Sequence, residues 1–208
     1  LDDPKQDELK KRLEIQNKRL EKDEQILKEL NDLSKKIDKE DLAEQLQNIA
    51  KQNKNKKRSL EQMLELTKRY YVRQKTKQLN EKLLQLSDRQ NELAKQNSLD
   101  NTSEKQKKIN QEFDELISQL GELKKKNSTL SSPIDIPDTT IEQESIKKDL
   151  QDAQKSLKKK EDLEDQNKKD VENKTAQKAQ IKASQKMRQT AQQMAVSYTH
   201  LTLPTNRC

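Results

Sequence analysis

The sequence is poor in the side chains on which enzyme active sites depend. Its 208 residues include no Trp, one Phe, one His and one Cys. The single histidine and the single cysteine are His200 and Cys208, which both follow residue 195. Residues 1–195 therefore contain no cysteine nucleophile, no histidine general base and no Cys/His zinc site. We expect no enzymatic activity, no catalytic residues, no metal site and no cofactor.

The last segment, 196–208, differs abruptly from the charged chain before it. Read as a whole, Val196–Thr205 resembles the translation of the transposon-end adapter used in sequencing libraries. We therefore expect a non-native tail and leave 196–208 out of the predicted fold, with a genuine C-terminal tail as the alternative. The chain begins with Leu1 rather than Met, so we also expect that the native N-terminus lies further upstream.

Apolar residues are scarce along the whole chain. Hydrophobic residues make up 28% and charged residues 39%, whereas a compact core needs close to half of its residues to be apolar. Lys, Glu and Gln favour helices, and one Gly and four Pro leave long stretches without a helix breaker. The composition fits long helices that bury a narrow stripe, and intrinsic disorder is the alternative.

The spacing of the apolar residues favours ordered helices over disorder. Leu13, Leu20 and Leu27 lie seven residues apart within 1–38, which we predict to be a coiled-coil helix. Polar residues such as Asp23 interrupt the complementary position of this repeat, which lowers stability and restricts register. A disordered chain has no reason to keep apolar residues in such a phase.

Residues 39–97 are predicted to form a long helix with a hydrophilic gap at 51–59. Its second half carries a regular three-and-four repeat, but the phase slips between Thr67 and Leu79, as in a stutter that locally unwinds a supercoil. Polar residues at 97–103 predict a loop there.

A third helix is predicted at 101–130. Asn101 and Glu104 have the spacing of a capping box at its start. Because the preceding loop is short, we expect this helix to pack antiparallel against residues 72–96.

Two prolines predict a loop at 131–139, where Thr139 and Glu142 suggest a second capping box. Residues 140–195 then form the longest predicted helix, ~80 Å at ~1.5 Å per residue. The predicted fold is all-α, an elongated coiled coil or an antiparallel helical bundle, and the spacing leaves open whether helices pair within one chain or between chains. The seam residues that we expect to carry helix–helix association are Leu79, Leu83, Leu86, Leu93, Ile109, Phe113, Leu116, Leu120 and Leu123.

Net charge is +7, with basic runs that include Lys54–Arg58. Acidic residues alternate with basic ones along nearly every predicted helix, so solvated faces with i,i+4 ion pairs explain these runs better than nucleic-acid contacts do. A basic nucleic-acid or polyanion-binding helical protein is the alternative interpretation.

Three stretches, Arg69–Lys95, Pro133–Thr139 and Lys182–Met194, together resemble a bacterial family of large coiled-coil proteins of unknown function. The resemblance covers most of 60–195, and the Pro-Ile-Asp-Ile-Pro-Asp-Thr loop is its specific part. It implies a membrane anchor upstream of Leu1 and more helix after Ala195, and it supplies no catalytic residues.

The expected function is a non-enzymatic structural or scaffolding segment of a larger, membrane-anchored bacterial protein. Its expected partners are helices, its own or those of another coiled coil, and nucleic acid is not an expected partner. The fragment itself contains no apolar run near the ~20 residues of a membrane span. Any localisation at the bacterial membrane therefore depends on an anchor that lies outside it.

Overall fold

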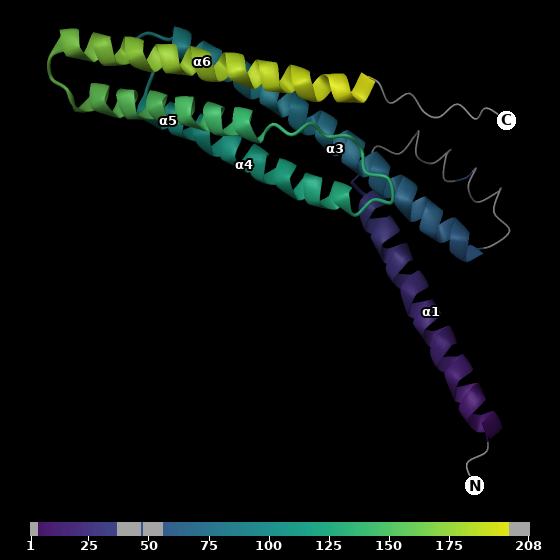
Figure 1. The fold of residues 1–208 in the computed structure, drawn as a ribbon. Helices are drawn as coiled ribbons and strands as arrows, with labels where there is room; N and C mark the ends of the chain where they lie inside the picture. The colour runs from purple at the N-terminus through teal and green to yellow at the C-terminus, as the bar shows by residue number, and fades with distance from the viewer. Residues whose placement is uncertain (1–3, 37–46, 48–55, 200–208) are drawn as a thin grey trace. The chain divides into compact units, whose positions relative to one another are not determined.

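The computed structural model describes residues 4–36, 47 and 56–199 (Figure 1). Regular structure in these ranges is helical throughout, which confirms the all-α prediction. The helices are α1 (Pro4–Ser34), α3 (Lys56–Lys95), α4 (Ser103–Ser128), α5 (Thr140–Asp162) and α6 (Gln166–Thr199).

The described chain forms two compact units. Unit 1 comprises the described residues up to Gln74 together with Thr129–Pro133, and unit 2 comprises those of 75–128 and 134–199. Helix α3 contributes to both, and the division falls between Gln74 and Lys75. That point lies inside the stretch where the heptad phase slips, so the change of seam along α3 coincides with a change of packing partners.

Unit 2 is an antiparallel helical bundle made of the second part of α3 with α4, α5 and α6. Pairs of contacts give the directions: Lys124 of α4 binds Asp138 just before α5, whereas Ser103 at the start of α4 binds Glu161 near the end of α5. In the same way α3 and α6 run in opposite directions, because Ser87 bonds to Ser184 while Gln96 bonds to Gln177. Figure 1 shows α4, α5 and α6 lying side by side in this arrangement.

The core of unit 2 is a stripe from each helix, repeating at three and four residues. α3 and α4 contribute mainly leucines, whereas α6 contributes small and flexible side chains. In α6 these residues are Ala176, Ala183, Met187, Ala191 and Met194, all at most 1% exposed. Alanine allows helices to approach closely, and methionine fills irregular gaps between them.

The single long helix predicted at 140–195 is wrong, because the structure divides it into α5 and α6. Leu163 ends α5 with an extended backbone (φ −84°, ψ 148°). Asp165 then caps α6, since its carboxylate accepts the backbone N–H groups of Asn167 (2.8 Å) and Lys168 (3.2 Å). The reversal lets α6 pack back on α5, and Val171 in the first turns of α6 is 63% exposed.

Both predicted capping boxes differ from the observed helix starts. Asn101 is fully buried, and Thr102 provides the cap of α4 by accepting the N–H of Lys105 at 3.3 Å. At the start of α5, Thr139 makes no side-chain capping bond. Asp138 instead accepts the N–H of Thr140 at 3.3 Å. Tertiary burial of Asn101 outweighs its local capping preference.

Unit 1 is built on contacts between α1 and the first part of α3. Lys22 pairs with Glu61 (3.4 Å) and Glu29 with Lys68 (3.0 Å), so the two helices run parallel. Ile26, only 6% exposed, lies on the side of α1 that carries these contacts. The backbone N–H of Ser131 also binds Glu65 of α3 at 2.8 Å.

Two of the predicted segments fall largely outside the described residues. These are the first part of the predicted helix 39–97, including most of its gap at 51–59, and the end of the tail 196–208. Within the described part, irregular chain links α3 to α4 and α4 to α5, and α6 continues to Thr199.

Candidate interaction surface

The nine predicted seam residues all lie in the core of unit 2. Each is at most 5% exposed, and Leu79 is fully buried. They come from α3 and α4, which pack as antiparallel neighbours, with Arg89 bound to Glu112 across the contact. These residues therefore join two helices of the same chain, and side chains of that chain bury the seam.

Sequence reasoning missed a chain of buried amide side chains near the α3–α4 turn of unit 2. Gln90 and Gln106 exchange two hydrogen bonds, of 2.9 and 2.8 Å. Gln180 donates to Gln106 (2.8 Å) and to Asn101 (2.9 Å), and Asn101 donates back to Gln180 at 3.0 Å. The four side chains are fully buried. Buried amides are favourable only when their hydrogen bonds are made, so this amide network fixes one register of α3, α4 and α6.

The amide network extends to α5 through Asn110. Gln106 donates to Asn110 at 2.9 Å, and Asn110 donates to Gln154 at 2.9 Å. Local sequence gives no sign of it, because glutamine and asparagine look like surface residues when their partners are distant in sequence. The one signal in the sequence was Gln90, which occupies a regular seam position between Leu86 and Leu93.

Lys160 is buried at the same end of unit 2, with 5% of its surface exposed. Its ammonium group donates to the backbone carbonyls of Ser98 and Asn101, both at 2.5 Å, in the turn between α3 and α4. Burial lowers the pKa of Lys160 below its ordinary value of 10.5, although Glu161 acts in the opposite direction. The lysine therefore holds the turn against the end of α5.

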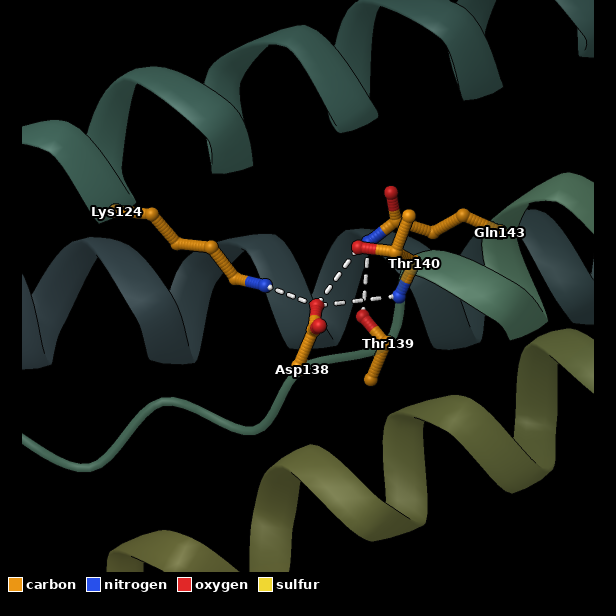
Figure 2. Close-up of polar contacts among 5 residues, drawn as sticks. All are labelled: Lys124, Asp138, Thr139, Thr140 and Gln143. Atoms are coloured by element: carbon orange, nitrogen blue, oxygen red, sulfur yellow. Dashed lines mark hydrogen bonds and ion pairs between the residues drawn. The ribbon is translucent and has the colours of Figure 1, made fainter.

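A second polar junction joins the end of α4 to the start of α5 (Figure 2). Asp138 accepts hydrogen bonds from the hydroxyl of Thr140 (2.7 Å) and from Lys124 (3.0 Å). These bonds hold the pKa of the Asp138 carboxyl below its ordinary value of 3.8. The side chain of Gln143 also donates to the hydroxyl of Thr139 at 2.8 Å. Asp138 is exposed and Thr139 is fully buried, and both side chains are held by neighbours at the end of α4 or the start of α5.

A cavity of about 230 Å³ lies between α3 and α4, where Leu86 and Leu116 are flanked by charged side chains. Arg89 and Glu112 neutralise each other there, and the hydrogen bond that Arg89 donates to Glu112 raises the pKa of Arg89. Among the described residues no three His, Cys, Asp or Glu side chains are grouped to hold a metal ion.

Helix α1 carries the regular apolar row that stays exposed in the described structure. Leu13, Leu20 and Leu27 are 50%, 62% and 52% exposed, and they lie one heptad apart. Because seven residues make almost two helical turns, the three leucines form one line along the helix. We call this set the leucine row.

The leucine row lies on a different face of α1 from the α3 contact. At 100° per residue, Ile26 and the paired Lys22 and Glu29 lie more than a quarter turn from Leu20. The row is therefore left open after α1 has packed against α3. Exposed leucines scattered singly need no explanation, but a row with heptad spacing indicates a contact with another helix.

The basic residues do not all lie on solvated faces with i,i+4 ion pairs, as the sequence had suggested. The side chains of Lys54–Arg58 lie outside the described set, and Lys160, the last of three successive lysines at 158–160, is buried. In contrast, residues 173–195 of α6 contain no acidic residue. Lys174, Lys178 and Lys182 are exposed there, and within the described part of the chain none of them forms an ion pair. We call these three residues the lysine row.

Comparison with protein families, curated proteins and solved structures finds no match to this chain. Among the described helices, none combines the length and the apolar character needed to cross a membrane. The functional interpretation therefore depends on the leucine row, the lysine row and the packing within each unit.

Proposed function

We propose that this chain is a non-enzymatic structural segment that acts by helix–helix association. The observation that carries the proposal is the leucine row of α1, three half-exposed leucines at heptad spacing on a helix whose neighbouring face is already packed. Each leucine side chain that becomes fully buried contributes roughly 1.5–3 kcal/mol, so covering such a row favours association.

The two units have different parts in this proposal. Unit 2 buries its own seam and its amide network, and it therefore serves as a self-contained rod of defined register. Unit 1 exposes the row that remains for a partner. The resemblance to large membrane-anchored coiled-coil proteins supports placing such a scaffold in a longer bacterial protein.

A photo-cross-linking amino acid placed at position 20 of the full chain tests this function. In the cell that encodes the protein, we expect covalent adducts from position 20 that map to a heptad-bearing helix, either of this chain or of another protein. The same amino acid at Gln185, exposed on α6, is the matched control. Leu13→Ser together with Leu27→Ser should abolish the adducts. Absence of any helical adduct from position 20 would overturn the proposed function.

Polyanion binding is a second candidate, favoured by the lysine row. Lysines at i,i+4 repel one another and lower helix stability by about 0.2–0.5 kcal/mol per pair. Of the three lysines, Lys174 alone has an acidic residue, Asp170, at i,i+4, so helix stability does not explain the row. A row of cations is a surface on which phosphate groups can be neutralised.

The second candidate is tested with a fluorescent DNA duplex at low salt. Replacing Lys174, Lys178 and Lys182 by Gln should weaken binding and reduce the salt slope by about 0.9 for each phosphate that the lysines had neutralised. Replacing Lys77, Lys82 and Lys107, which lie on faces of mixed charge, is the control and should have a smaller effect. No binding of the unmodified chain at low salt removes this candidate.

A further inference from the structure

The partner of the leucine row follows from the charges beside it. Arg19 immediately precedes Leu20, and Glu24 follows it by four residues. With the leucines at position a of the heptad, Arg19 occupies position g and Glu24 occupies position e. Both side chains are exposed, and neither takes part in an ion pair within the described part of the chain. They are therefore free to pair with a partner that covers the row.

We propose that α1 pairs with α1 of a second copy of this chain, as a parallel, in-register two-stranded coiled coil. In that arrangement position g of one helix faces position e of the following heptad in the other. Arg19 then meets Glu24 of the second copy, and the two-fold symmetry repeats the pair. The inference rests on the proposed function, and it names the occupant of the same surface.

The charges also select the direction of pairing. In an antiparallel pair centred on Leu20, position g faces position g, which places two Arg19 side chains against each other. Like charges in this position are unfavourable, so the parallel arrangement is preferred. Leucine lies at position a of three successive heptads, whereas the complementary position is polar at Gln16 and Asp23. This narrow seam should give a reversible dimer rather than a permanent one.

The α3 contact adjoins this dimer interface. Ile26, seven residues after Arg19 and therefore also at position g, is buried on the α3 side, whereas Arg19, Leu20 and Leu27 remain exposed for the second copy. The second copy covers a face of α1 that lies beside the one occupied by α3. Each chain can therefore keep unit 1 intact while it dimerises.

The test is sedimentation velocity of the full chain over a range of concentrations. We expect a monomer–dimer equilibrium that Leu20→Ser weakens at least ten-fold. Arg19→Glu alone and Glu24→Arg alone should each weaken it about five-fold, because two exposed ion pairs become two like-charge contacts. The double variant should restore the original affinity. Lys28→Glu, at the exposed position b of the heptad, is the matched charge control.

Disulfide trapping reports whether the two α1 helices run parallel or antiparallel. In a Cys208→Ser background, Leu13→Cys alone and Leu27→Cys alone should each form a disulfide-linked dimer, and Thr175→Cys on α6 should not. An antiparallel pair would instead link Leu13→Cys to Leu27→Cys only in a mixture of the two variants, and that result would overturn the parallel arrangement.

The outcomes separate this inference from the proposed function. A chain that stays monomeric at all concentrations overturns the second-copy inference. If position 20 then cross-links to a heptad helix of another protein, the proposed function stands with a different partner. If neither dimer nor helical adduct is found, both proposals fall.

Discussion

At the scale of the residue, Lys160 shows how tertiary packing changes the chemistry of an ordinary side chain. It belongs to a run of three lysines, yet its neighbour Lys159 is exposed while Lys160 is buried under the α3–α4 turn. An ammonium group there replaces its water with the carbonyls of Ser98 and Asn101. The two carbonyls do not fully replace the lost hydration of the charged form, so burial lowers the pKa of Lys160.

The lowered pKa predicts how stability depends on pH. Between the folded-state pKa of Lys160 and its ordinary value of 10.5, the unfolded chain binds this proton more tightly than the folded chain does. The free energy of unfolding should therefore rise with pH across this window, relative to a Lys160→Met variant. Urea unfolding at several alkaline pH values measures the difference, with Lys159→Met as control. Parallel stability curves for the unmodified chain and Lys160→Met would contradict it.

Gly121 gives a second prediction at this scale. It lies inside α4 without a positive φ, and a Cβ atom built there meets nothing within 4 Å. Close approach of another helix, for which glycine is often required, is therefore not the reason for this residue. Gly121→Ala should stabilise the protein by about 0.5–1 kcal/mol and raise its melting temperature, because alanine loses less backbone entropy in a helix. Ala179→Gly on α6 should shift the melting temperature in the opposite direction.

At the scale of the element, the amide network explains why α3, α4 and α6 have one register. Leucine stripes can slide past one another by a heptad with little loss of burial. Gln106 cannot, because its amide exchanges bonds with Gln90 and also binds Gln180. A polar group placed in a core lowers the stability of the alternatives in which it has no partner.

Gln106→Leu tests the amide network. The substitution leaves the amides of Gln90 and Gln180 buried with fewer partners, so the unfolding free energy should fall by about 1–3 kcal/mol. Gln185→Leu, at an exposed position of α6, should change it by less than about 0.5 kcal/mol. Chemical denaturation followed by circular dichroism gives both values. An equal effect of the two substitutions would show that the network does not hold the bundle together.

At the scale of the whole molecule, leucines that follow a heptad occur both in a buried core and on an exposed helix face. Leu116 and Leu120 lie in a filled seam inside unit 2, whereas Leu13, Leu20 and Leu27 remain exposed in unit 1. Leu116 and Leu120 lie four residues apart and the leucines of the row lie seven apart, but both spacings follow a heptad, and a heptad alone does not distinguish a core from an interaction surface. What distinguishes them is whether the chain supplies a helix to cover each stripe.

This difference predicts how the molecule responds to charge in each set. Leu116→Asp together with Leu120→Asp should greatly reduce the helical signal in circular dichroism, because unit 2 loses its core and buries two charges. The same change at Leu13 and Leu20 should leave unit 2 folded and retain most of the helical signal. Retained helicity in the first variant would show that the bundle is not held by its leucine seam.

The helical fold and much of the core follow from the sequence alone. Leu79, Phe113 and Leu123 were identified as seam residues because their positions repeat at three and four residues, which places them on one side of a helix. The end of α5 was missed although Asp165 is a good cap, because the charged residues around it are compatible with an uninterrupted helix. The buried amides were missed because Gln180, which closes the network, is more than seventy residues from its partners Asn101 and Gln106.

The sequence by itself determined which stretches are helical and which face of each helix is apolar, because both are set by local propensity and by a period of three and four residues. Tertiary structure alone decided which stripes meet within the chain, where the last helical stretch turns back, and which leucine row is left open. Those outcomes depend on contacts between segments far apart in sequence, and the periodicity of one helix does not specify which other helix packs on it.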